Sequence, residues 1–330
     1  MIEFDIYNPA VHLEQVIDLE KILWEGKTTE EIRNIFLWKY PAVSDLANAF
    51  VALDGNRVVG FRGFFIQDYI KDGRIFPVAV LGDAAVHPHY QRQGIFSNLT
   101  KKAIEYYSKS SVNYILALSS NTKSSPGYLK MGWKPFLHKE YRIGVSMLNM
   151  CLGRSTKQST VKLQGCEIEI VDFSNIDVWA RELDAFCQSI DGKHGISLRR
   201  NYHYWTWRFA NPDWNVAFAI MRRNGKINGV IAFLSEVRRG IKVIRILDAV
   251  VENPSLFPVL YKGLKKMTHA WCYFILAATS IPNGILKKIF PFSRCSKTNT
   301  PADFYLIKTL DDASFDEADK SIELNYSNID

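Results

Sequence analysis

The sequence predicts an α/β protein with two tandem domains, each a mixed, mainly antiparallel sheet flanked by helices. The first observation is an internal repeat. Trp38–Tyr40 and Trp207–Phe209 are both aromatic-basic-aromatic triplets at the end of a helix-like stretch, and a glycine follows 22 residues after each tryptophan. The second observation is that two similar strand ends, Leu81–Val86 and Ile246–Val251, each follow a hairpin. Such self-similarity is typical of a duplicated fold.

The elements of each half are expected in one order: a strand, helices, three antiparallel strands, a helix, a strand, a short helix and a strand. Glycine and asparagine mark the hairpin turns. These turns are expected at Asp54–Asn56, Asp72–Gly73, Arg223–Lys226 and Gly240. The helix after the hairpins is expected at 95–108 and 254–269, and the buried strand that follows it at 112–118 and 272–278.

The boundary between the two domains is expected in a polar segment. Gly153–Thr160 lacks any apolar period, which is typical of a linker. We therefore expect a first domain over 1–150, a linker over 151–165, a second domain over 166–310 and a tail over 311–330. The tail carries a net charge of −6 and residues 1–310 carry +13. An acidic end of this kind is most simply a solubilising, poorly ordered segment.

Composition excludes several classes of protein. The 330 residues are 47% hydrophobic and 23% charged, which is ordinary for a globular chain and unlike a disordered, collagen-like or coiled-coil one. No apolar run approaches the ~20 residues of a membrane span, and no signal peptide is recognisable. The five cysteines are scattered without CxxC spacing, so we expect a reduced, cytoplasmic protein with no metal site. A basic body suits a phosphate-bearing partner, whereas the lack of a basic helix argues against nucleic acid.

The segment Val86–Ser97 carries the main chemical signal. It lies between an apolar strand and an amphipathic helix that is expected to begin at Ile95. Gly94 in the turn allows a ligand to approach the backbone closely. The free N–H groups at the start of the helix, together with the helix dipole, favour negative charge at that point. The segment therefore predicts a cradle for a pyrophosphate group.

The same segment resembles the acyl-CoA loop of the GNAT superfamily of N-acyltransferases. From Val86 to Ile95 the chain reads Val-x-Pro-x-x-Gln-Arg-Gln-Gly-Ile. A second element follows at the expected distance, because Asn121 ends the next strand and Tyr128–Trp133 is similar to the family's Tyr-x-x-x-Gly-(Phe/Trp). The resemblance covers the whole expected fold over residues 1–145, and the fold plan without the motifs over 165–310.

The resemblance implies a role for each matching residue. Val86 would pair through its backbone with the pantetheine arm of CoA, in a gap between splayed strands, and Asn121 would contact the same arm. Tyr128 matches the general acid that protonates the departing thiolate. Direct attack by an amine on a polarised thioester needs no covalent acyl-enzyme. The backbone amides expected to hold the pyrophosphate are those of Gln91, Arg92, Gln93, Gly94, Ile95, Phe96 and Ser97.

Two departures from the family pattern carry expectations of their own. Phe96 stands where the family usually has a small residue, so its ring must point into the packing between helix and sheet. In the second half Glu252–Leu256 occupies the cradle position without a glycine, and Pro254 removes one N–H donor. We therefore expect the second half to be a degenerate copy without bound CoA.

The group that accepts the proton of the amine is less clear from the sequence. Asp83 lies on the strand next to the expected thioester position and is a candidate general base. Its twin Asp248, in the half without a cradle, favours a structural role for this aspartate instead. The loop histidines His87 and His89, and the strand residue Asp68, are weaker candidates.

The leading function hypothesis is an acyl-CoA-dependent N-acyltransferase. Acetyl-CoA is the expected donor, and a small-molecule amine bound between the halves is the expected acceptor, for example an amino-sugar nucleotide. A transferase that uses aminoacyl-tRNA is an alternative, but such an enzyme does not need the intact CoA loop. A non-catalytic CoA-binding or interaction module is another alternative, which turnover with amines would exclude. The sequence leaves a homo-oligomer open.

Overall fold

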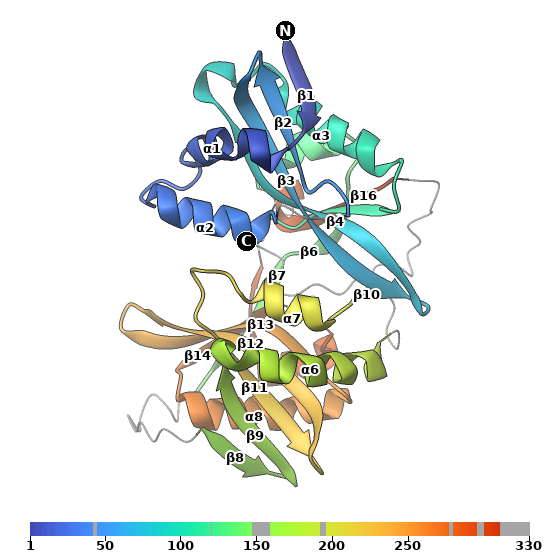
Figure 1. The fold of residues 1–330 in the computed structure, drawn as a ribbon. Coiled ribbons are helices and arrows are strands. Elements are labelled where there is room, and N and C mark those ends of the chain that lie inside the picture. Colours follow the sequence, from blue (N-terminus) through green and yellow to red (C-terminus); the bar gives the residue numbers. More distant parts are fainter. Residues whose placement is uncertain are drawn as a thin grey trace.

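A computed structural model describes residues 1–41, 45–119, 121–146, 159–191, 196–276, 280–295 and 300–310. Residues 151–158 of the predicted linker and the whole predicted acidic tail lie outside these residues. The described chain forms two eight-stranded sheets, one above the other in Figure 1, with helices on their faces. The predicted fold class, two mixed sheets flanked by helices, is confirmed.

The first half follows the predicted order of elements as far as β6 and adds one strand, β7, that was not predicted. Its elements are β1 (Ile2–Ile6), α1 (Pro9–Glu20), α2 (Thr29–Lys39), β2 (Ala49–Asp54), β3 (Arg57–Lys71), β4 (Arg74–Val86), α3 (Ile95–Tyr107), β5 (Tyr114–Ala117), α4 (Ser125–Lys130), β6 (Lys134–His138) and β7 (Glu140–Val145).

The second half repeats this order, with an additional strand at its start and a two-residue strand before α7. Its elements are β8 (Thr160–Leu163), β9 (Cys166–Asp172), α6 (Ile176–Ile190), β10 (Ser197–Leu198), α7 (Tyr202–Arg208), β11 (Val216–Arg223), β12 (Lys226–Arg238), β13 (Ile241–Val251), α8 (Phe257–Thr268), β14 (Cys272–Leu276), α9 (Asn283–Ile289), β15 (Phe292–Cys295) and β16 (Phe304–Thr309).

Local chemistry explains the hairpins. Four of their turns hold two consecutive residues with positive φ, at Asp72–Gly73, Gln164–Gly165, Asn224–Gly225 and Arg239–Gly240. Turns of this hand match the right-handed twist of the strands they join, and glycine adopts them without steric cost. The hairpins are therefore specified by residues at the turns themselves.

The two halves exchange one strand each. Sheet A runs β1-β2-β3-β4-β5-β16-β6, and the two-residue strand β10 pairs with β3 off this path. The last described strand of the chain therefore lies inside the first sheet, as Figure 1 shows. Sheet B runs β15-β7-β14-β13-β12-β11-β9-β8, so β7 of the first half lies inside the second sheet. β16 is antiparallel to both β5 and β6, and β7 is antiparallel to both β14 and β15. The exchange is reciprocal, because β7 and β16 hold matching places in the repeated order.

The repeated triplets meet at the junction of the halves. The indole N–H of Trp38 donates to the carbonyl of Trp207, and that of Trp207 donates to the carbonyl of Trp38, both at 2.8 Å. The two rings stack with centroids 6.0 Å apart. Tyr40 and Phe209, the last residues of the triplets, are buried in the cores of their own halves. The paired triplets thus join two related halves about an approximate two-fold axis.

The predicted domain limits do not coincide with the sheets at three strands. β7 precedes the predicted linker but belongs to sheet B, whereas β10 and β16 lie in the second half but belong to sheet A. The limits 1–150 and 166–310 stay a prediction about folding units.

Candidate functional site

The central strands of sheet A separate toward one end. β4 pairs in parallel with β5 only over Val78–Val80, after which β4 continues to Val86 while β5 ends at Ala117. Val86 faces Gly60 on β3, and the bond that closes this pair runs from the N–H of His87 to the carbonyl of Val59 at 2.9 Å. In an antiparallel ladder this pattern turns the N–H and C=O of Val86 away from β3 and into the gap. The Val86 carbonyl accepts from the Gln91 side chain at 3.1 Å.

The N-terminus of α3 opens beside this gap. Gly94 is the N-cap with φ +79°, and no side chain caps the helix. The first hydrogen bond of the helix runs from the Asn98 N–H to the Gly94 carbonyl, at 3.0 Å. The N–H groups of Ile95, Phe96 and Ser97 precede this bond and are left without a partner within the helix. A Cβ on Gly94 would meet only Asn98 Nδ2, at 3.8 Å, so the glycine is required by its backbone angle rather than by space. The helix dipole adds positive potential at this end.

Seven of the nine residues predicted to bind CoA line one cavity at this helix end. The cavity measures about 290 Å³ and is lined by Val86, Tyr90, Gln91, Arg92, Gly94, Ile95, Phe96 and Ser97. Arg92 has a positive φ of 63°. Where residues of positive and negative φ alternate, successive backbone N–H groups point toward one concavity. The shape and polarity of this cavity fit a phosphate group, and the role of each residue in binding stays a prediction.

Two of the predicted contact residues do not line this cavity. Gln93 donates from its side-chain amide to the His89 carbonyl at 3.1 Å, and Asn121 has a local structural role. The side-chain oxygen of Asn121 accepts from the N–H groups of Lys123 at 2.9 Å and Ser124 at 3.1 Å, which caps the turn before α4. The side chain is exposed. Its predicted contact with the pantetheine arm stays a prediction, and only the amide nitrogen is uncommitted by these two bonds.

Phe96 directs its ring into the packing between helix and sheet, as its size requires. Its ring centroid lies 5.7 Å from that of Tyr128, which α4 supplies from the other side. Tyr128 is 4% exposed and also packs on Trp133 at 5.3 Å. Its hydroxyl accepts a hydrogen bond of 2.7 Å from Nη2 of Arg62. Among the described residues no acceptor takes the proton of that hydroxyl.

Arg62 is a site residue that sequence reasoning did not identify. Its side chain is buried, and its guanidinium carbon lies 5.3 to 5.7 Å from the ring centroids of Phe64, Phe96 and Tyr128. Nη1 donates to the Gly82 carbonyl at 3.3 Å, while Nε is buried without a partner. Within the described part of the chain no carboxylate forms an ion pair with it. A cation in a predicted strand gives no local signal that it points inward.

Asp83 is held by two residues at the end of α2. Its carboxylate accepts from Lys39 Nζ at 3.1 and 3.2 Å and from the Tyr40 hydroxyl at 3.1 Å. The Asp83 N–H donates back to the Tyr40 oxygen at 2.8 Å. The Tyr40 side chain lies very close to β3 and β4. A Cβ on Gly63 would come within 2.3 Å of its ring, and a Cβ on Gly82 within 2.4 Å of its hydroxyl oxygen. Both glycines are therefore needed to admit Tyr40.

The twin Asp248 has the same kind of partners. It receives two bonds from Arg200, at 2.7 and 2.9 Å, and one from the Tyr204 hydroxyl at 2.8 Å. An aspartate held by a cation and a tyrosine therefore recurs in both halves. The general-base role of Asp83 stays a prediction, and the recurrence favours a structural role.

Buried Glu20 lies close to the Lys39–Asp83 pair. Burial raises the pKa of Glu20 well above its ordinary value, and the negative charge of Asp83 adds to that rise, whereas Lys39 opposes it. Trp24 donates to one oxygen of Glu20 at 3.3 Å. The first half therefore has two carboxylates for one buried ammonium.

The weaker candidates have partners on the surface. His87 contacts Arg57 at 3.0 Å, and its pKa lies below the ordinary value because of desolvation first and the charge of Arg57 second. Asp68 forms an ion pair of 3.3 Å with Arg199. His89 lies in the same short turn as His87.

The corresponding place in the second half is closed. β13 and β14 pair over three residues and then separate, as β4 and β5 do. The cavity there measures about 50 Å³, and Glu252 and Pro254 stand on its wall. A carboxylate repels a phosphate, and proline lacks an N–H to offer it.

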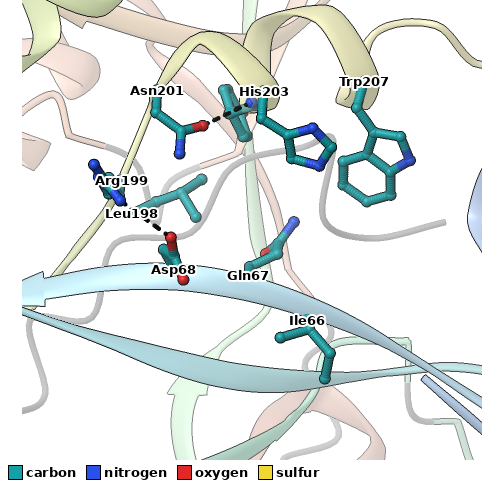
Figure 2. A pocket seen from close by; sticks show the side chains of 9 residues that line it. Ile66, Gln67, Asp68, Leu198, Arg199, Asn201, His203 and Trp207 are labelled. Atoms are coloured by element: carbon teal, nitrogen blue, oxygen red, sulfur yellow. Dashed lines mark hydrogen bonds and ion pairs between the residues drawn. The ribbon is translucent and has the colours of Figure 1, made fainter. Parts of the chain in front are cut away.

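A further pair of cavities lies where the halves meet. One measures about 140 Å³, and Figure 2 shows Asn201, His203 and Trp207 of the second half facing Gln67 and Asp68 on β3 across it. The other measures about 500 Å³ and shares with it Ile66, Asp68, His203 and Trp207. Lys39 and Phe64 also line the larger cavity, which places it beside the residues that hold Asp83 and Arg62.

The described residues hold no group of three His, Cys, Asp or Glu side chains arranged to bind a metal ion. They also hold no helix that is long and apolar enough to cross a membrane.

Comparison with known proteins addresses the fold and the first half. Residues 10–136 match the family model of the acetyltransferase (GNAT) domain. No curated protein matches the chain in sequence. A GCN5-related N-acetyltransferase from Anabaena variabilis superposes with a TM-score of 0.67 over 94% of this chain and 73% of its own, at 15% identity.

Two further solved structures have the same overall fold. A tandem GNAT protein from the clavulanic acid biosynthesis pathway gives a TM-score of 0.52 over 95% of this chain and 100% of its own, at 16% identity. Saccharomyces cerevisiae N-myristoyltransferase, with bound myristoyl-CoA, gives 0.53 over 93% and 79%, at 12% identity. The chain therefore has the fold of these tandem GNAT structures, and its residues 10–136 match the model of the GNAT acetyltransferase domain.

Proposed function

We propose that the chain is an acyl-CoA-dependent N-acetyltransferase that modifies a small-molecule amine, with its active site in the first half. The observation that carries the proposal is the uncapped N-terminus of α3 at Gly94, which opens into a 290 Å³ cavity beside the separated end of β4. A GNAT domain match over this region and the N-acetyltransferase names of similar structures support it.

The residues fit acetyl-CoA as the donor. The N–H groups of Ile95, Phe96 and Ser97 and the guanidinium of Arg92 suit the pyrophosphate, and the inward-facing N–H and C=O of Val86 suit the amides of the pantetheine arm. When bound, the donor supplies the activated acyl group. A backbone N–H in the gap would polarise its thioester carbonyl.

The proton balance assigns Tyr128 a role. The amine nitrogen forms a bond to the thioester carbon, the carbon–sulfur bond breaks, and the thiolate takes the proton of the Tyr128 hydroxyl. Among the described residues that proton has no other acceptor, and the ring is fixed by Phe96 and Trp133. The proton that the amine loses goes to water or to Asp83. One proton then returns to Tyr128 and restores its hydroxyl, so that the protons balance.

The larger cavity between the halves is the proposed site of the acceptor. Its wall combines the carboxylates Asp45 and Asp68 with the rings of Phe65 and Trp207, a combination that suits an ammonium group. The second half would then contribute to substrate binding without binding CoA itself. Amino-sugar nucleotides belong in the panel of amines to be tested.

Release of free CoA thiol tests the proposal. We expect the full chain to release it from acetyl-CoA only when an amine of the panel is present, and to use acetyl-CoA in preference to myristoyl-CoA. Gly94→Asp should weaken acetyl-CoA binding by at least about 100-fold, because it sets a negative charge against the phosphates and strains the backbone.

The matched control for this variant is Ser255→Asp, which adds the same charge at an exposed position in the corresponding turn of the second half. It should leave acetyl-CoA affinity unchanged. Equal affinity in Gly94→Asp and the wild type would reject the cradle. Binding of acetyl-CoA without turnover on any amine would favour the non-catalytic alternative.

A further inference from the structure

Among the described residues of the first half, Arg62 is the one buried cation that contacts the proposed catalytic tyrosine. Its exposed fraction is 2%, and its nearest polar partners are the Tyr128 hydroxyl at 2.7 Å and the Gly82 carbonyl at 3.3 Å. Burying a guanidinium costs several kcal/mol unless charge or hydrogen bonds compensate. Three aromatic faces offset only part of that cost.

The duplication supplies an internal control for what the sheet itself requires. Trp38 and Trp207 set the correspondence between the halves, and by the same spacing Arg62 corresponds to Ile231. Ile231 is fully buried in the core of the second half. An apolar side chain therefore satisfies the fold at this place, and the cation occurs in the half that has the cradle.

The direction of the hydrogen bond gives Arg62 a task. A guanidinium has only donors, so the tyrosine oxygen must accept, and its own proton is turned elsewhere. When that proton leaves, the oxygen becomes negative beside a fixed positive charge in a dry surrounding, where the attraction is strong.

We propose that Arg62 is a positioning residue for Tyr128: it fixes the hydroxyl with its proton free to be donated and stabilises the phenolate that forms when the thiolate is protonated. This inference rests on the proposed function. The Arg62 cation keeps all its protons throughout. The proton that reaches sulfur comes from Tyr128, and the tyrosine regains one from the proton that the amine releases.

A double-mutant cycle on turnover tests the proposal. Arg62→Met keeps much of the volume and removes the charge, and the buried Ile231 shows that an apolar side chain is tolerated at the matching place. We expect kcat to fall about 10- to 100-fold, within the range of general acid catalysis, and KM for acetyl-CoA to stay within about twofold. In a Tyr128→Phe background the same substitution should lower kcat by less than about twofold.

Controls separate this role from a structural one. Arg74→Met removes an exposed arginine from the start of β4 and should change neither constant. Arg62→Lys keeps a charge with a shorter reach and should give an intermediate kcat, and it replaces the methionine variant in the cycle if a thermal melt shows that variant unfolded.

Each result decides between distinct conclusions. An unchanged kcat in Arg62→Met, or an equal loss of kcat with and without the Tyr128 hydroxyl, would overturn the role of Arg62 and leave the acetyltransferase proposal standing. A wild-type chain that transfers no acyl group to any amine would overturn the proposed function, and this inference with it.

Discussion

The two halves share a backbone plan and differ in the groups that the plan presents. In both, the central parallel strands pair over three residues and then separate. In the first half the helix beside the gap begins at an uncapped glycine, and the cavity measures about 290 Å³. In the second half Glu252 and Pro254 stand at that place, and the cavity measures about 50 Å³. The gap is thus a property of the fold, whereas the cradle depends on a few residues in one turn.

Each half also holds one aspartate with a cation and a tyrosine, an arrangement called here the aspartate lock, and this is a feature that the halves have in common. Asp83 with Lys39 and Tyr40, and Asp248 with Arg200 and Tyr204, are built alike in a half with a cradle and a half without one. Features common to both halves are the candidates for a structural role. Features confined to the first half, namely Gly94, Arg62 and Tyr128, are the candidates for chemistry.

The largest expected effect concerns the exchanged strands. Ending the chain before Phe304 removes β16 from between β5 and β6 and deletes the buried side chains Tyr305, Leu306 and Ile307. Burial of three such side chains contributes about 5–9 kcal/mol, which is comparable with the whole stability of a typical domain. We expect this truncated chain to be insoluble or unfolded by circular dichroism.

The matched control is a chain that ends at Leu310, which keeps every described strand. It should melt within a few degrees of the full chain. A folded first half in the shorter truncation would show that sheet A forms without its exchanged strand, and would contradict the reciprocal arrangement.

The next expected effect is a difference in affinity for CoA between the halves. Titration calorimetry of the full chain with acetyl-CoA should give one site per chain, because the second half offers a carboxylate and a proline where the first offers free N–H groups. A stoichiometry near two would show that the second half also binds acetyl-CoA, and would contradict the proposed difference between the halves.

Tyr128→Phe should lower kcat by roughly 100-fold with saturating acetyl-CoA, because the thiolate then leaves without a proton donor. The variant also strips a buried donor of Arg62 of its acceptor, so a loss of about 1–3 kcal/mol in the free energy of unfolding is expected as well. Steady-state rates on protein shown to be folded by a thermal melt separate the two effects. Wild-type turnover in this variant would transfer the proton-donor role to water.

Replacing each aspartate in turn tests the lock in both halves. Asp248 and Arg200 are almost wholly buried, so Asp248→Asn should cost about 3–5 kcal/mol of stability. Asp83→Asn should cost less, about 1–3 kcal/mol, because the ammonium of Lys39 would still have the carboxyl group of Glu20 near it. We expect kcat of Asp83→Asn to fall less than about tenfold. A fall of 100-fold or more at unchanged acetyl-CoA affinity would instead make Asp83 the proton acceptor.

The sequence predicted features that short segments specify. The hairpins were predictable because residues such as Asn224 and Gly225 determine their own turn, and the cradle because Gly94 stands between an apolar strand and an amphipathic helix. The strand exchange was not predictable, because β7 and β16 are both short strands whose patterns do not state which sheet they join. Arg62 was missed for a similar reason: its burial depends on Phe96 and Tyr128, which lie far along the chain.

The smallest expected effect concerns Glu20, the second carboxylate beside the first-half lock. Its pKa is raised in the folded chain, mainly by burial and next by the charge of Asp83. From the ordinary value of 4.5 up to the raised value, the folded chain therefore holds a proton that the unfolded chain has released. Stability in that window must fall as pH rises, by about 1.4 kcal/mol for every tenfold difference in proton affinity.

Glu20→Gln removes this dependence while keeping an oxygen that accepts from Trp24. Urea unfolding measured from pH 4 to 8 should show the variant gaining stability relative to the wild type as pH rises. If the free energies of unfolding of the two proteins change in parallel with pH, Lys39 compensates the charges of both carboxylates fully. The stability of the first-half lock would then depend on pH in the same way as that of the second.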